Sequence, residues 1–242
     1  MATYNDEAVV LRTQRLGEAD RVVTVLSRNH GKLRGVAKGV RRTSSKFGAR
    51  LEPFAHVDLQ VSETRGMPIF ASVVSRQLYG KDLVNDYARY TAAEAMVETA
   101  DKLVPEEAVP ALRHYHLLIG ALHALADGAR RPTVLLDSYL LRACAVAGYT
   151  PVLTTCAVCG RPVASGFFSP VSGGVVCAHD RPPGSPAIDQ TTLAYLGALL
   201  AGDWPTVELA RAADVSQASG LVAAFVNWHV ERGLRSLRHV DR

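Results

Sequence analysis

The sequence predicts an α+β multidomain protein, in which an N-terminal five-stranded β-barrel of the OB-fold type precedes an α-helical domain with an inserted zinc-binding module. Alternating apolar and polar residues, the period of half-buried strands, dominate the first 80 residues. Ala-rich segments with helical spacing follow, and a Cys-x-x-Cys pair with a third cysteine interrupts them. We therefore expect the barrel in residues 1–80, the helical domain in 81–242 and the module in about 150–187.

The expected strands are short Val-rich segments that Gly, Asn or Pro separates. Barrels with this number of strands and this length are typical of the OB-fold, whose strand face and long loops commonly hold oligonucleotides. The polar, basic segment VRRTSSKFGARLE between the third and fourth strands is expected to be a loop or a short helix. The predicted strands are residues 8–13, 19–27, 32–39, 54–62 and 68–77.

Helical spacing of apolar residues begins near residue 82 and continues to Pro105. A second stretch ends at Gly128, and a third begins at Pro132 and ends at Gly148, which is the usual placement of Pro and Gly at helix ends. We expect these three helices to form a bundle. The predicted helices are residues 82–104, 109–128, 132–149, 188–201 and 216–234.

The net charge of +4 hides an asymmetry between the two ends of the chain. Residues 1–80 contain 13 Lys and Arg against 7 Asp and Glu, whereas residues 81–242 contain 14 against 16. The segment from Arg21 to Leu51 has no carboxylate at all. A basic face without internal counter-charge favours a polyanionic partner, although such a run can also be an ordinary solvated surface.

The candidate nucleic-acid-binding residues are the cations of this segment and one aromatic residue. Lys and Arg bind phosphates without reading sequence, and Phe47, between Lys46 and Arg50, is expected to stack on an unpaired base. The full candidate set is Arg21, Lys32, Arg34, Lys38, Arg41, Arg42, Lys46, Phe47 and Arg50.

The cysteines predict a metal site. Cys156 and Cys159 form a Cys-x-x-Cys turn, and 17 residues separate Cys159 from Cys177, a spacing typical of tetrahedral zinc. The fourth ligand is either Asp180, which keeps the x-x spacing, or the softer His179. Cys144 lies in a predicted helix and is assigned to core packing.

Other readings of the cysteine motif remain open. Cys156 and Cys159 could be a redox pair, but such pairs usually open a helix after a strand. They could also belong to a metal site that no longer holds zinc tightly. No Glu lies beside the ligands to act as a general base, so we expect structural zinc, one ion per chain, and no catalysis.

Several functional classes are disfavoured by the sequence. Gly31-Lys32 is followed by Leu33, which does not match a P-loop, and neither Gly-x-Gly-x-x-Gly nor Gly-x-Ser-x-Gly occurs. No apolar stretch reaches the length of a membrane span, and the first residues lack the features of a secretory signal. We therefore expect a cytoplasmic protein that is not an enzyme.

The chain resembles the bacterial recombination mediator family RecO. In the first third the resemblance is carried by Gly17-Glu18-Ala19-Asp20, His30-Gly31-Lys32, Ala37-Lys38-Gly39, Arg41-Arg42 and Leu51-Glu52-Pro53. The later segments YLLRACAVAGYTPVLTTCAVCG and Gly173-Gly174-Val175-Val176-Cys177 resemble the helical region and zinc module of the family. The resemblance spans nearly the whole chain. Family members with zinc usually show Cys-x-x-Cys twice, and this chain departs from that pattern at Asp180.

The resemblance implies a nucleoid-associated DNA repair and recombination protein without enzymatic activity. Such proteins bind single- and double-stranded DNA, anneal complementary strands, contact the tail of single-strand-binding protein and act with RecR to load RecA. Binding of that acidic tail implies an apolar groove with cations at its rim, for which Arg131 and Arg142 are the candidates.

Three alternatives come from other classes of function. An RNA-binding protein with OB and zinc domains would use the same residues, and comparing DNA with RNA oligonucleotides distinguishes it. A metal-dependent hydrolase would cleave labelled nucleic acid, and a pure adaptor would show no salt-sensitive DNA binding.

Overall fold

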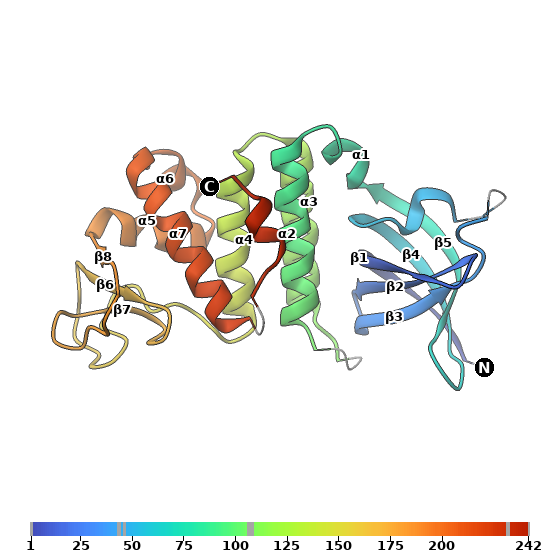
Figure 1. Cartoon of the computed structure of the whole chain (residues 1–242), viewed down its shortest axis with the longest axis horizontal. Coiled ribbons are helices and arrows are strands. Elements are labelled where there is room, and N and C mark those ends of the chain that lie inside the picture. The colour runs from blue at the N-terminus through green and yellow to red at the C-terminus, as the bar shows by residue number, and fades with distance from the viewer. Residues whose placement is uncertain (1, 43–44, 46, 106–108, 231–232, 242) are drawn as a thin grey trace. The chain divides into compact units, whose positions relative to one another are not determined.

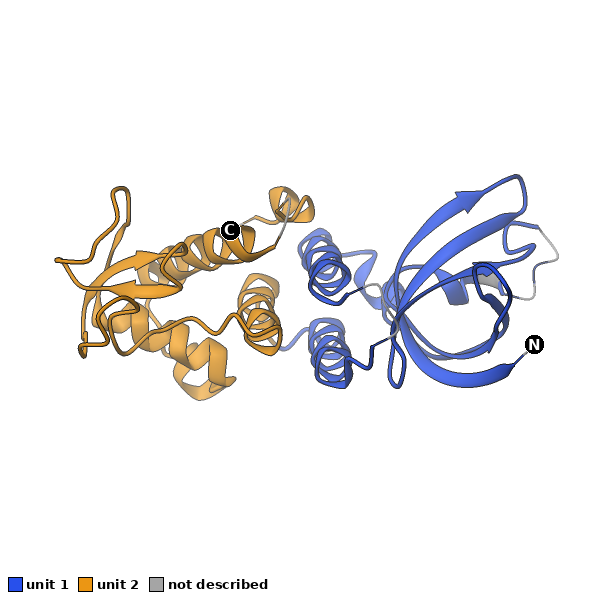
Figure 2. Cartoon of the chain, turned by 90° about the horizontal axis from the view of Figure 1, so that it is seen from below, with its two compact units in different colours: residues 1–129 blue, residues 130–242 orange. Residues whose placement is uncertain are grey.

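A computed structural model of the chain describes residues 2–42, 45, 47–105, 109–230 and 233–241. Its contacts divide it into two compact units, residues 1–129 and 130–242 (Figure 2). The first unit contains a β-barrel and the helices that directly follow it, and the second contains the remaining helices and the cysteine motif (Figure 1). The predicted α+β architecture is confirmed.

The barrel consists of β1 (Thr3–Leu16), β2 (Asp20–Ser27), β3 (Gly31–Ala37), β4 (Ala55–Ser62) and β5 (Ile69–Leu78). The strands close in the order β1-β2-β3-β5-β4, and β3 pairs with β5 in parallel while the other pairs are antiparallel. This is the five-stranded Greek-key barrel that the alternating pattern predicted. A bulge between Val10 and Arg12 allows β1 to extend beyond its predicted ends and pair with both neighbours.

The inside of the barrel is filled by the apolar residue of each alternating pair. Val10, Val23 and Val25 belong to this core, together with Phe70. A Cβ on Gly35 would lie 2.7 Å from the ring of Phe70, so glycine at this position makes room for the aromatic ring. The short 3-10 helix η1 (Gly48–Leu51) occupies part of the predicted loop between β3 and β4.

Three helices complete the described part of the first unit: α1 (Tyr79–Leu83), α2 (Tyr87–Leu103) and α3 (Leu112–Asp127). The single helix predicted over residues 82–104 is wrong at its start, because Asp86 begins a new helix by accepting a hydrogen bond from the N–H of Arg89 at 3.0 Å. Gly128 ends α3 with φ +74°, as the sequence predicted.

Part of the outer face of the barrel, over β1 and β2, is covered by α2 and α3. His56, Val9, Leu26 and Lys32 lie side by side across four strands and are buried, although none belongs to the barrel core. His56 contacts Tyr115 of α3, with Nε2 and the hydroxyl 3.1 Å apart. The outer side of these strands therefore carries a buried row of two apolar and two polar side chains beside the helices.

The second unit contains α4 (Pro132–Val146), α5 (Gln190–Ala201), α6 (Trp204–Glu208), α7 (Ala212–His229) and the 3-10 helix η2 (Ser236–His239). Here α4 packs against α5 and α7. Of the three helices expected to form a bundle, α2 and α3 belong to the first unit and α4 belongs to the second. Within the part of the chain that the structure describes, no helix has the length and hydropathy of a membrane span.

Candidate metal centre and nucleic-acid surface

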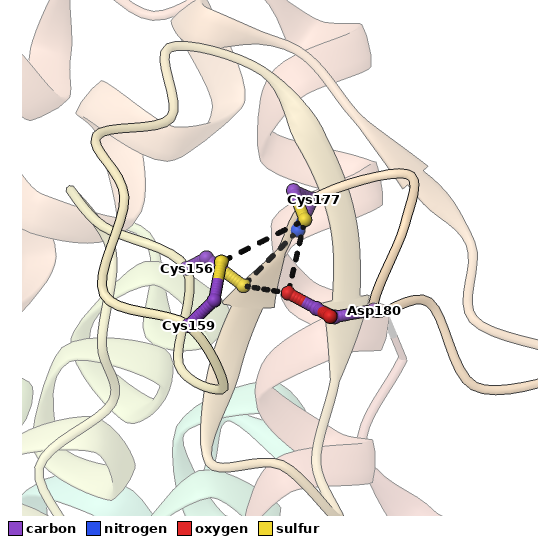
Figure 3. A group of neighbouring side chains, drawn as sticks. All are labelled: Cys156, Cys159, Cys177 and Asp180. Atoms are coloured by element: carbon purple, nitrogen blue, oxygen red, sulfur yellow. Dashed lines mark hydrogen bonds between the residues drawn. The ribbon is translucent and has the colours of Figure 1, made fainter.

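Cys156, Cys159, Cys177 and Asp180 come together in the second unit, with their ligand atoms all within 4.8 Å of one another (Figure 3). Sγ of Cys159 lies 3.9 Å from Sγ of Cys177. Oδ2 of Asp180 lies 3.3 Å from Sγ of Cys156 and 3.1 Å from Sγ of Cys177. The structure therefore brings together the three cysteines and one of the two candidate fourth ligands.

Two turns, supported by a small sheet, position these residues. The sheet contains β6 (Gly166–Ser169), β7 (Gly174–Val176) and β8 (Ala187–Ile188), and Cys177 directly follows β7. The Cys156 carbonyl accepts a hydrogen bond from the N–H of Gly160 at 2.9 Å, and Gly160 has φ +73°. This left-handed turn is the one for which the sequence placed glycine after the second cysteine.

Hydrogen bonds favour the charged form at Cys156 and Asp180, whereas the bond to Asp180 raises the pKa of Cys177. The pKa of Cys156 lies below its usual value, mainly because the backbone N–H of Cys159 points at its sulfur, and the N–H of Cys177 adds a second bond at 3.4 Å. The pKa of Asp180 also lies below its usual range because of hydrogen bonds from Cys159, His179 and Cys177. Thiolate and carboxylate are the forms that bind metals.

His179 lies outside the cluster. Its side chain is 83% exposed, and Nδ1 contacts Oδ1 of Asp180 at 2.9 Å, on the carboxylate oxygen that does not approach the sulfurs. A histidine in this place orients the ligand rather than acting as one. Of the two alternatives left open by the sequence, the geometry favours Asp180.

The donor set fits a zinc ion. A tetrahedral ion with sulfur bonds of about 2.3 Å would separate two sulfurs by about 3.8 Å and a sulfur from an oxygen by about 3.5 Å. The Cys159 to Cys177 distance of 3.9 Å and the sulfur to oxygen distances of 3.3 and 3.1 Å are close to these values. The cluster could therefore hold a metal ion. Cys144 is buried in α4, as its assignment to core packing predicted.

Acidic residues outside the basic segment neutralise part of it. Nη1 of Arg21 lies 2.6 Å from Glu52, and Nη1 of Arg28 lies 3.1 Å from Glu7. Lys32 is only 6% exposed, and its ammonium group contacts the carbonyl and carboxylate of Asp101 at the end of α2. No pattern within the segment could have indicated these pairs, because every partner lies elsewhere in the sequence.

Two of the candidate residues are buried, and one lies outside the described residues. Lys32 faces α2, so its charge is directed to Asp101. Phe47 is 3% exposed and belongs to the barrel core, which leaves no ring face on which a base could stack. Its neighbours Lys46 and Arg50 made it look like a surface aromatic. Lys46 is not among the residues that the structure describes.

Five of the other candidates are exposed, and Arg21 is half-buried beside Glu52. Nη1 of Arg41 donates to the carbonyls of Gly17 and Glu18 at 3.4 and 2.9 Å, which joins the segment after β3 to the turn between β1 and β2. Arg15, opposite Arg21 in the β1–β2 register, adds an exposed cation that the sequence analysis missed. The alternation of inward and outward residues along β1 could have indicated that Arg15 is exposed. The exposed candidates are Arg34, Lys38, Arg41, Arg42 and Arg50.

Of the candidate partner residues, Arg142 lies on α4 and Arg131 directly precedes it. Arg131 is exposed and precedes the first residue of that helix. Arg142 is half-buried beside Gly202, where a Cβ would lie 3.5 Å from its guanidinium. Gly202 ends α5, so Arg142 lies near the carbonyl end of a helix, where a cation is favourable without any partner.

Comparison with known proteins agrees with this arrangement. The family model described as "Recombination protein O N terminal" matches residues 1–79, and that described as "Recombination protein O C terminal" matches residues 84–238. The chain belongs to the RecO family. It is 52% identical to "DNA repair protein RecO" of Streptomyces coelicolor over 248 residues, and 52% identical to the protein of that name from Cutibacterium acnes over 246 residues, with the full length of both chains covered in each case. The cysteine cluster, with Asp180 as its fourth member, lies within the region that the C-terminal family model matches.

Proposed function

We propose that this chain is a non-enzymatic recombination mediator that binds single- and double-stranded DNA and anneals complementary strands. Annealing requires no group transfer, because base pairing supplies the free energy once two polyanions are close together. The protein needs only to screen phosphate repulsion and leave the bases accessible. Membership of the RecO family supports this role.

The observation that carries the proposal is the group of exposed cations after β3. Lys38, Arg41 and Arg42 lie close together in the sequence after β3, where Arg41 contacts the β1–β2 turn, and Arg34 precedes them on β3. We propose that these residues, with Arg50, Arg21 and Lys46, contact phosphates. Lys32 and Phe47 are left out of the proposed surface because both are buried. Arg15 extends the surface along β1.

Reversing one of these charges is expected to lower the salt dependence of DNA binding. In Arg42→Glu, the slope of log K against log salt should fall by about one for each phosphate contact that is lost. Affinity should decrease about equally for unrelated DNA sequences, since phosphate contacts carry no sequence information. Fluorescence anisotropy at several salt concentrations measures both quantities, and the rate of annealing should fall in parallel.

Two matched variants separate a local contact from a change of net charge. Arg113→Glu makes the same charge reversal on an exposed residue of α3, and Lys32→Met with Asp101→Leu removes a buried cation of the basic segment without leaving its partner unpaired. Both should retain the wild-type slope. An Arg42→Glu protein that also retains it would place the interface elsewhere, and equal annealing of DNA and RNA would favour the RNA-binding alternative.

We propose further that the second unit holds one structural zinc ion per chain at the cysteine cluster and carries the partner contacts. The partners would be RecR, the tail of single-strand-binding protein and, indirectly, RecA. The zinc would join the two turns and thereby stabilise the segment between α4 and α5. None of these contacts requires a chemical step, which is consistent with a protein that is not an enzyme.

Arg131 and Arg142 are expected to contribute differently to binding of the tail of single-strand-binding protein. Arg131 is exposed and can pair with a carboxylate of an acidic tail, whereas Arg142 lies near the end of α5. Titration of a labelled tail peptide against Arg131→Ala should show about a tenfold loss of affinity, because a charge-assisted hydrogen bond is lost. Arg142→Ala should bind the peptide with an affinity closer to that of the wild type. Equal binding by wild type and Arg131→Ala would remove Arg131 from the groove.

A further inference from the structure

Arg161 lies beside the cysteine cluster and contacts it in two ways. Its backbone carbonyl accepts a hydrogen bond from the N–H of Cys156 at 2.7 Å. Its side chain reaches the sulfurs, with Nε 3.4 Å from Sγ of Cys159 and Nη2 3.9 Å from Sγ of Cys177. The guanidinium therefore lies against the exposed edge of the cluster, on the two cysteines that are less buried than Cys156.

The negative charge of the cluster makes the contact with the Arg161 guanidinium favourable. Three thiolates and one carboxylate carry four negative charges, so a divalent ion leaves two of them uncompensated. The positive charge of Arg161 halves that excess. Its N–H groups also withdraw electron density from the sulfurs, which makes a bound thiolate a weaker nucleophile and a weaker base.

We propose that Arg161 is a positioning residue of the metal site, whose guanidinium holds the sulfurs of Cys159 and Cys177 in place and protects them from loss of metal and from electrophiles. This inference rests on the zinc site of the proposed function. It extends that site by a fifth side chain, which donates to sulfur and does not itself bind the ion. His179 occupies the equivalent place on the carboxylate of Asp180.

The side chain can be tested apart from the backbone contact, because substitution leaves the carbonyl of residue 161 in place. The zinc-loaded full chain is mixed with a chromophoric chelator, and the rate of zinc transfer is measured for wild type, Arg161→Gln and Arg161→Lys. Arg161→Gln should release zinc about tenfold faster, since loss of a ligand's outer partner typically weakens metal binding by about 10- to 100-fold. Arg161→Lys keeps the charge and should restore part of the difference.

Arg181→Gln is the matched control, since it removes an arginine of the same segment whose guanidinium lies 4.0 Å from the ring centroid of Phe167. It should release zinc at the wild-type rate. Equal rates for wild type and Arg161→Gln would overturn the proposal. Equal acceleration by Arg181→Gln would also overturn it, because the effect would then be one of general charge.

Alkylation with iodoacetamide provides a readout that loosening of the fold would not reproduce. In the zinc-loaded Arg161→Gln protein, Cys159 and Cys177 should react faster than in the wild type, while Cys156 should not. Faster reaction of all three would indicate unfolding and contradict the assignment. The metal content of the wild type is measured first: absence of zinc would remove the proposed metal site itself, whereas zinc with unchanged rates would remove only the role of Arg161.

Discussion

Purified Cys156→Ser is expected to contain no zinc and to lose the ordered structure of residues 150–187, while the barrel stays folded. Cys156 is 2% exposed, and its sulfur accepts the N–H of Cys177, so no other side chain can take its place. Structural zinc contributes about 10 kcal/mol or more to the folding of small zinc-finger peptides, and a four-residue cluster without the ion has only hydrogen bonds to hold it. Metal analysis and hydrogen exchange resolved by segment measure the two effects.

Three variants make the metal prediction specific. Cys144→Ala removes a buried thiol of α4 and should retain one zinc per chain. Asp180→Ala should lose the ion, whereas His179→Ala should keep it, because only the carboxylate faces the sulfurs. If His179→Ala lost zinc and Asp180→Ala kept it, the fourth ligand would be the imidazole. Zinc-free wild type with unaltered thermal unfolding would end the structural-zinc proposal.

Asp101→Ala is expected to destabilise the first unit by about 3 kcal/mol, since removing one partner of a buried ion pair typically costs about 3–5 kcal/mol. Lys32 would keep a buried ammonium group without its carboxylate, and Arg12 would lose a bond of 2.7 Å to the same side chain. Partial exposure of Arg12 places the expectation at the lower end of that range. Urea unfolding followed by circular dichroism gives the difference in free energy.

The origin of that loss can be checked with two further proteins. Asp127→Ala removes an exposed carboxylate of α3 and should change stability by less than about 0.5 kcal/mol. The double variant Lys32→Met with Asp101→Leu replaces the pair by apolar side chains and should recover much of the stability. If the double variant is as unstable as Asp101→Ala, the loss arises from packing at the end of α2 and not from the uncompensated charge.

Local patterns in the sequence predicted the strands, most of the helices and the cysteines of the cluster, but left its fourth member open between Asp180 and His179. The strands follow from period-two alternation, and the cluster follows from the spacing of Cys156, Cys159 and Cys177, because both are properties of short segments. The start of α2 was missed because the Ala-rich pattern runs through it, and the capping hydrogen bond of Asp86 is visible only in three dimensions.

The basic surface could be predicted only in part, for a physical reason. A run without carboxylates looks uncompensated in the sequence, yet Glu52, Glu7 and Asp101 reach it from other elements. Phe47 was assigned to a flexible loop from its charged neighbours, although a 3-10 helix directs its ring into the barrel. Pairings between residues far apart in sequence depend on topology, which composition does not contain. Of the predicted cations, the exposed set after β3 is the part that the proposed function retains.

The helices that cover the barrel also affect how the protein is made. Val9 and Leu26 lie on the outer face, and the segments that bury this face begin at Tyr87 and end at Asp127. A ribosome therefore releases the whole barrel sequence before it has synthesised the cover. Until then the nascent chain presents an apolar strip to the cytosol, where it can associate with other chains or with a chaperone. A fragment that ends at residue 80 would stay in that state permanently, whereas one that ends at residue 129 would include its own cover.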